Sequence, residues 1–180
     1  MVTPWHDVAL VDSAAWAGWT TLAAWRGRRW SGDRLARDGW LTRLRPWERG
    51  GGLYVGLGIR RWKRWVPDAG RLFGGRPRRV VRPRDPAEWE ALVAESRRAE
   101  RVHWLTLAAL PVVLVWNRGI LLAAMVVYAG VANGPCIAIQ RYNRARLGRL
   151  LAGAGATGRL PPAPPAAATG AGRRPGPGRR

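Results

Sequence analysis

Residues 119–139, GILLAAMVVYAGVANGPCIAI, decide the fold of this chain. These 21 residues carry no charge, and a helix needs roughly 20 apolar residues to cross the hydrocarbon core of a bilayer. Asn133, Gly134 and Pro135 interrupt the stretch late. Because proline lacks a backbone donor, we expect the last turn to be bent or unwound. The stretch predicts a membrane-spanning helix that is irregular near its end.

A second apolar stretch, VHWLTLAALPVVLVW, occupies residues 102–116 directly before it. The residues between the two, Asn117, Arg118 and Gly119, are typical of a tight turn. The pair predicts a helical hairpin with spans at about 102–117 and 119–139. The first arm is short for a span, so two buried helices or a re-entrant hairpin remain alternatives.

A third candidate span, VALVDSAAWAGWTTLAAW, covers residues 8–25 and contains Asp12. Basic residues follow it at Arg26, Arg28 and Arg29, and none precedes it. A secretory signal peptide has the opposite arrangement, so we predict an N-terminal membrane anchor helix.

The charges alternate with these apolar blocks. The chain has 31 Lys and Arg against 11 Asp and Glu, a net charge of +20. Residues 26–101 hold 21 of the basic residues, and residues 141–180 hold nine and no acid. The positive-inside rule then places the N-terminus outside, residues 26–101 and the C-terminus in the cytoplasm, and the turn at Arg118 outside. This pattern predicts a multi-pass protein of the cell membrane. It argues against a nucleic-acid-binding protein, because the charge avoids the apolar blocks and the sequence has no helix-turn-helix, zinc or RNA-recognition signature.

The fold class that follows is an all-α membrane protein. We expect an anchor helix, a basic cytoplasmic loop with one amphipathic helix, and a transmembrane hairpin, together forming one domain over residues 1–152.

The loop helix should begin at Asp85-Pro86, a capping residue followed by a first-turn proline, and continue into the hairpin. Residues 40–47 suit the membrane interface, residues 53–59 suit a strand or packing segment, and residues 76–84 suit an extended loop against anionic lipid. Residues 153–180, rich in Ala, Gly, Pro and Arg, predict a disordered tail.

Polar residues gather at the two cytoplasmic ends of the predicted hairpin. Glu100 and His103 are three residues apart and share a helix face. A carboxylate beside an imidazole suits a general base acting on a hydroxyl, so we predict both as catalytic. The candidate substrate-binding residues around them are Arg97, Arg98, Trp104, Asn133, Gln140, Arg141, Asn143 and Arg144. The alternative is that His103 is a polar anchor and Glu100 pairs with a neighbouring arginine.

Metal chemistry has little support in the sequence. The chain has one cysteine, Cys136, and two histidines, His6 and His103. The Glu-x-x-His spacing of Glu100 and His103 also occurs in di-iron bundles, but those need it twice. We therefore expect no metal and no cofactor.

Several short motifs together resemble one family. They are Trp62-Lys63, residues 67–70 (PDAG), 95–104 (ESRRAERVHW), Trp116-Asn117, 133–136 (NGPC) and 140–146 (QRYNRAR). In their order and spacing they are similar to the glycosyl-4,4'-diaponeurosporenoate acyltransferase family of staphyloxanthin-type carotenoid biosynthesis, over roughly residues 40–150. The sequence departs from that pattern at Ala145, where proline is usual, and in the extension after Leu151.

This resemblance implies an enzyme that moves a fatty acyl group from a thioester donor, acyl-CoA or acyl-carrier protein, to a sugar hydroxyl. The acceptor would be a glycosylated carotenoid or a similar glycolipid, and membrane lipid would be a partner. For that reaction, the chemistry and position of the residues suggest that Arg141 and Arg144 would hold the donor's phosphates or oppose charge on the carbonyl oxygen, and that Asn133 would donate a hydrogen bond to that oxygen. The alternative function is a non-enzymatic small membrane protein that binds anionic lipid.

Overall fold

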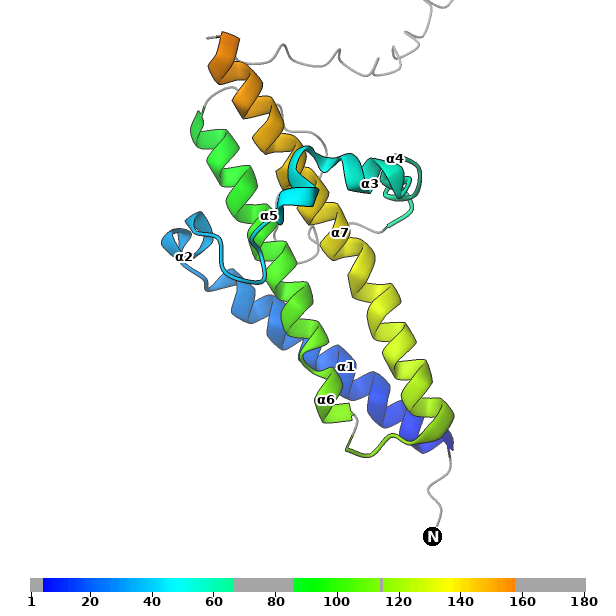
Figure 1. Ribbon diagram of the computed structural model, residues 1–180. Coiled ribbons are helices and arrows are strands. Elements are labelled where there is room, and N and C mark those ends of the chain that lie inside the picture. Colours follow the sequence, from blue (N-terminus) through cyan, green and yellow to red (C-terminus); the bar gives the residue numbers. More distant parts are fainter. Residues whose placement is uncertain (1–4, 67–85, 114, 158–180) are drawn as a thin grey trace, which may run out of the picture.

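Three long helices form the body of the protein. The computed structural model describes residues 5–66, 86–113 and 115–157, and every regular element within these ranges is a helix. The long helices are α1 (Trp5–Arg28), α5 (Pro86–Leu107) and α7 (Gly119–Thr157). Helices α5 and α7 lie side by side and run in opposite directions, and α1 packs obliquely against α5 (Figure 1). The predicted all-α fold is confirmed.

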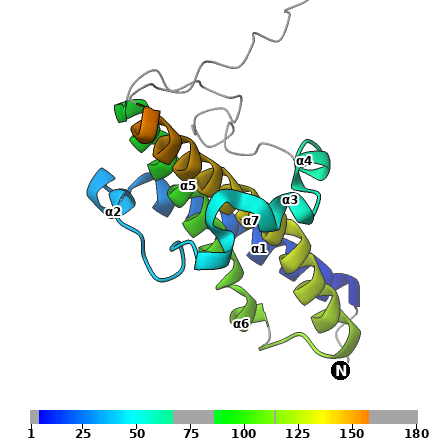
Figure 2. The ribbon, with the colours of Figure 1, turned by 45° about the horizontal axis from the view of Figure 1, so that its top comes forward.

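Between α1 and α5 the described residues form four short helices, with α2 on one side of the long helices and the others on the opposite side (Figure 2). They are α2 (Gly32–Ala36), the 3-10 helix η1 (Pro46–Gly51), α3 (Gly52–Gly56) and α4 (Ile59–Trp62). Helix α2 packs on α5, and η1 packs on α7. The strand considered for residues 53–59 is wrong, because α3 and α4 occupy that segment. The extended loop predicted for residues 76–84 lies outside the described residues.

Proline accounts for both ends of α5. Pro86 opens the helix, where its missing N–H has no intrahelical partner to lose. Pro111 cannot donate to the carbonyl of Leu107, and α5 ends at that residue. The chain resumes as the short helix α6 (Leu110–Val113) before the turn at residues 115–118. The segment predicted as one span over 102–117 is therefore two helices with a break between them.

Helix α7 runs without interruption through Pro135. The unwound turn that we expected there is wrong, because the segment around Pro135 is helical. Proline costs the helix one hydrogen bond, and α5 contacts α7 on both sides of the site, through Asn133 and through the Gln140 carbonyl. These contacts attach the halves of α7 before and after Pro135 to the same helix, α5. The helix also continues to Thr157, past the predicted start of the tail at residue 153, and residues 158–180 lie outside the described ranges.

Two small apolar clusters hold the elements together. Tyr54, Ile59, Ile139 and Tyr142 pack α3 and α4 onto α7. Trp16, Ala109 and Ala129 join α1, the α5–α6 break and α7 near the other end of the bundle.

Large apolar side chains also cover the outside of the bundle. Ile120, Val127 and Val131 on α7 are 81%, 63% and 69% exposed. Within the described ranges, residues 119–153 of α7 form the one helical stretch long and apolar enough to cross a membrane, and only 22% of its most apolar part is buried. An apolar helix that packs so little of its surface into the protein is suited to a lipid environment.

Candidate functional site

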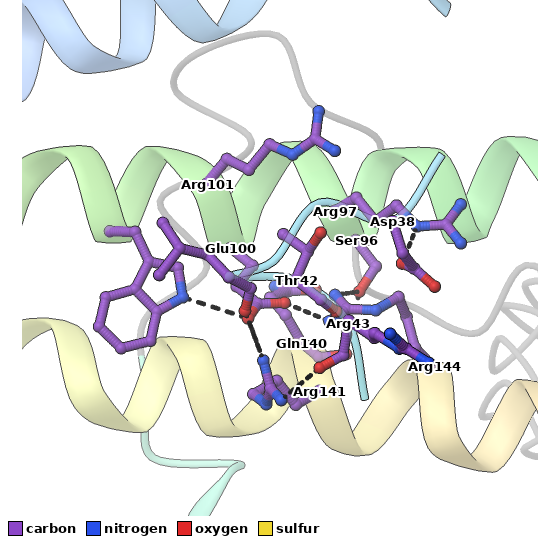
Figure 3. A network of polar contacts seen from close by, with 12 residues as sticks. Asp38, Thr42, Arg43, Ser96, Arg97, Glu100, Arg101, Gln140, Arg141 and Arg144 are labelled. Carbon is purple, nitrogen blue, oxygen red and sulfur yellow. Dashed lines mark hydrogen bonds and ion pairs between the residues drawn. The ribbon is translucent and has the colours of Figure 1, made fainter. Parts of the chain in front are cut away.

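Two polar groups of side chains occupy the contact between α5 and α7. The first is a carboxylate cluster of Glu48, Glu100, Arg141 and Arg144, drawn in part in Figure 3. The second is the pair formed by His103 and Asn133. The carboxylate cluster lies toward the C-terminal half of α7, and the His103–Asn133 pair lies closer to the apolar half.

Glu100 is the centre of the carboxylate cluster, and its side chain is 0% exposed. Its Oε1 accepts hydrogen bonds from Arg141 Nη1 at 2.7 Å and from Trp104 Nε1 at 3.2 Å, and its Oε2 accepts one from Arg144 Nη2. Figure 3 shows the carboxylate reaching from α5 toward the arginines of α7. Arg141 and Arg144 are three residues apart and therefore share a helix face. Two cations thus balance the charge of one fully buried carboxylate, and an indole N–H donates a further hydrogen bond to it.

Glu48 brings η1 into the same cluster. Arg141 donates two parallel hydrogen bonds to Glu48, from Nε to Oε1 at 2.6 Å and from Nη2 to Oε2 at 2.5 Å. This bidentate geometry is the strong form of the arginine–carboxylate pair. The hydroxyl of Tyr54 and the backbone N–H of Arg45 also donate to Glu48. Burial raises the pKa of Glu48, but the hydrogen bonds from Arg141, Tyr54 and Arg45 outweigh burial and lower that pKa to about 2.

The two arginines also hold the loop before η1. Arg141 donates to the carbonyls of Leu41 and Arg43, and Arg144 donates to the carbonyl of Thr42 at 2.9 Å. Ser96 on α5 accepts from Arg144 and donates to the carbonyl of Gln140 at 3.0 Å. The carboxylate cluster therefore attaches residues 41–48 to α5 and to α7.

The arginines of α5 have a different environment. Arg97 donates to the carbonyls of Leu35 and Ala36 and pairs with Asp38 at 2.7 Å. Arg101 donates to two further carbonyls at the end of α2, those of Arg34 and Arg37. Cations are favoured at the negative end of a helix, so these contacts dock α2 on α5. Arg98 pairs with Glu95 one turn earlier on its own helix, at 2.8 Å.

His103 and Asn133 meet across the helix interface. His103 Nδ1 lies 2.9 Å from Asn133 Oδ1, and the Asn133 amide nitrogen donates to the carbonyl of Ala129 at 3.0 Å. Because the amide oxygen is then the atom that faces the ring, Nδ1 must carry the proton. In the neutral ring Nε2 is left as the acceptor. His103 is half-buried, whereas Asn133 is buried, so the buried amide fixes the orientation of the more accessible ring.

The structure thus divides the residues predicted from the hairpin ends into separate environments. Glu100, Arg141 and Arg144 meet in the carboxylate cluster, with Trp104 beside them and Gln140 buried next to it. Glu100 was expected to orient His103, but its oxygens face the arginines and the His103 ring is held by Asn133. Asn133 was expected beside a broken helix, and it lies instead in a regular one. Asn143 is half-buried on α7.

Glu48 and Tyr54 are the members of the site that sequence reasoning missed. A signal for Glu48 was present in the local pattern of Arg45, Pro46 and Glu48. Proline favours the first position of a helix, and a glutamate two residues later is placed to accept the N–H of the residue before the proline. No local signal identifies Tyr54, because its role depends on the left-handed conformation of Gly50 and Gly51, which turns α3 back onto α7.

The half-buried imidazole of His103 is a candidate proton acceptor in this arrangement. An imidazole with Nδ1 protonated and hydrogen-bonded can accept a proton at Nε2 from a hydroxyl. The carboxylate cluster has its charges paired internally, so it supplies rigidity next to that imidazole.

Comparison with known proteins gives one consistent result. The model of the glycosyl-4,4'-diaponeurosporenoate acyltransferase family matches residues 37–153. Curated proteins of that name from Staphylococcus aureus strains N315, USA300 and Newman are each 36% identical to this chain over 96 residues. The match covers 52% of this chain and 56% of each relative, so the chain spans about half the length of the curated relatives. No solved structure matches it.

The matched region contains every residue of the carboxylate cluster and the His103–Asn133 pair. The family model extends over more than half of the chain, and the resemblance seen in the short motifs is confirmed. The chain belongs to the glycosyl-4,4'-diaponeurosporenoate acyltransferase family.

Proposed function

We propose that this protein is a membrane acyltransferase that moves a fatty acyl group from a thioester donor to a sugar hydroxyl of a glycosylated carotenoid or similar glycolipid. The family match over residues 37–153 carries this proposal, because it includes the whole α5–α7 site. The donor is acyl-CoA or acyl-carrier protein.

His103 is the general base of the proposed reaction. Its Nε2 takes the proton of the acceptor hydroxyl while the hydroxyl oxygen attacks the thioester carbonyl. The carbon–sulfur bond then breaks, an ester forms, and the proton passes from His103 to the departing thiolate. Asn133 positions the ring through Nδ1, the role that we had given to Glu100.

The arginines of the carboxylate cluster take a structural role in this proposal. The guanidinium groups of Arg141 and Arg144 are already bound to Glu48, Glu100 and backbone carbonyls, so binding donor phosphates would require those buried pairs to break. We therefore assign them to holding η1 and α5 on α7. Breaking such a pair leaves an uncompensated buried charge, which makes a second use of these arginines unfavourable.

The proposed membrane position follows from the length of α7. A helix of 39 residues is about 58 Å long at about 1.5 Å per residue, whereas the hydrocarbon core is about 30 Å thick. If α7 enters the bilayer at Gly119, its second half extends beyond the far side. Asn133 then lies inside the bilayer near the cytoplasmic surface, and Arg141 and Arg144 lie beyond it. The exposed Trp40, Trp47 and Trp65 around that level suit the headgroup region, and Arg45 and Arg64 stack on the first and last of them.

Cysteine labelling tests this topology. In a Cys136→Ala background, Val115→Cys, in the turn before α7, should react with a membrane-impermeant maleimide on intact cells, and Gly148→Cys should react only after the cells are opened. Both positions are exposed in the structure, and neither substitution removes an arginine that sets the orientation. Equal labelling of the two positions on intact cells contradicts the hairpin.

Production of the ester tests the function. The full chain, expressed in a host that makes a glycosylated carotenoid, should convert it to a product heavier by one fatty acyl group. The His103→Ala chain at equal abundance serves as the control. A protein that only binds anionic lipid gives no acylated product with either chain, and that result contradicts the enzyme.

A further inference from the structure

A small apolar cavity lies between α1 and the α5–α6 break. Its volume is about 130 Å³, and seven residues line it: Ala15, Trp16, Trp19, Ala109, Val112, Val113 and Trp116. Its surface is almost wholly carbon, and the Trp19 indole nitrogen is bonded to the Leu105 carbonyl. Dry cavities of about 150 Å³ with such walls bind small hydrocarbons, so this cavity fits a short length of hydrocarbon chain.

One side of the cavity opens to the outside of the bundle. Trp16, Ala109 and Val113 form its floor and are 7%, 4% and 2% exposed. Val112 and Trp116 form its rim and are 51% and 38% exposed. In the proposed topology this rim faces lipid, so an apolar chain reaches the cavity without crossing water.

A continuous set of contacts links the cavity to His103. His103 meets Asn133, and the Asn133 amide donates to the carbonyl of Ala129. Ala129 packs in one cluster with Trp16 and Ala109, which line the cavity. Leu107, the last residue of α5, follows His103 by four residues, about 6 Å along the helix axis, and Ala109 lies two residues beyond it. A flexible chain attached at a carbonyl beside His103 spans that distance.

We propose that this cavity binds the methyl end of the donor's acyl chain and thereby selects its length. This inference rests on the proposed function, and it identifies the part of the substrate that occupies the cavity. A saturated chain bends at every carbon–carbon bond and can turn into a small cavity below the site. A conjugated carotenoid is a rigid rod and cannot, so the occupant is the fatty acyl chain.

Photo-cross-linking tests occupancy without any need for turnover. The purified full chain in detergent is irradiated with a long-chain fatty acid that carries a diazirine at its methyl end. We expect labelling in peptides of α1 and α6. Val112→Phe, which fills the rim, should lower that labelling roughly tenfold, and Val127→Phe should not. Val127 is 63% exposed on α7 and is absent from the cavity lining, so it is a matched control. Labelling that Val112→Phe leaves unchanged overturns the proposal, whether or not the protein is an acyltransferase.

With active enzyme, the same variants report on selectivity. Val112→Phe should shift the kcat/KM ratio of long-chain over short-chain acyl thioesters toward the short ones by roughly tenfold, and Val112→Ala should shift it the other way. An unchanged ratio in both variants overturns the proposed length selection while leaving the transferase reaction intact.

Discussion

His103→Ala is expected to lower the turnover of acyl transfer by roughly 10² to 10⁴, the effect of losing a positioned general base. The effect follows from the tautomer that Asn133 imposes, because that tautomer leaves Nε2 free of its own proton and able to take one from the acceptor hydroxyl. Initial rates of ester formation at saturating donor, with protein abundance measured in parallel, give the change in turnover.

Two further variants separate chemistry from structure. His103→Gln keeps an amide N–H that can donate to Asn133 but cannot act as a base, so it should be as impaired as His103→Ala. His6→Ala removes the other histidine, on the exposed start of α1, and should leave turnover unchanged. A fully active His103→Gln protein contradicts the general-base assignment and leaves the acyl transfer to another group.

The long helices were predictable because their signals are local. The uncharged stretch at residues 119–139 indicated α7, and Pro86 marked the start of α5. Pro135 misled us because an interior proline costs a helix roughly 3 kcal/mol, yet α7 stays helical there, with α5 in contact on both sides of the proline. Pro111 had the effect expected of an interior proline, and it divides the first arm of the hairpin into α5 and α6.

Most residues of the site were predictable, with Glu48 and Tyr54 as the exceptions, but the pairing of these residues was not. Helical spacing placed Glu100 and His103 on one helix face, and we inferred from this shared face that the two residues act together. A fully buried carboxylate is stabilised most by cations, and two arginines of α7 reach Glu100 from across the interface. The His103 ring instead contacts the neutral amide of Asn133. Such pairings depend on tertiary packing, including the packing of η1 on α7. The periodicity of apolar residues in the sequence does not predict that contact.

Glu100→Gln should therefore act first on stability. The substitution removes the buried charge that Arg144 and Arg141 face, and their side chains are only 3% and 12% exposed. Breaking a buried ion pair from one side costs about 3–5 kcal/mol, because the remaining cation has neither water nor a counter-charge. Arg141 keeps Glu48, so the uncompensated charge falls mainly on Arg144. The free energy of unfolding in detergent, followed by tryptophan fluorescence, measures the loss.

Glu95→Gln provides the matched control, since it is the same substitution five residues earlier on α5. Glu95 and its partner Arg98 are 27% and 33% exposed, and pairs with such access to solvent contribute at most about 1 kcal/mol. The double variant Glu100→Leu/Arg144→Met should be more stable than Glu100→Leu alone, because it leaves no unpaired charge on Arg144. A Glu100→Gln protein that is as stable as the parent but inactive would instead return Glu100 to the catalytic role, since a carboxylate that only holds the helices together cannot be replaced without a cost in folding.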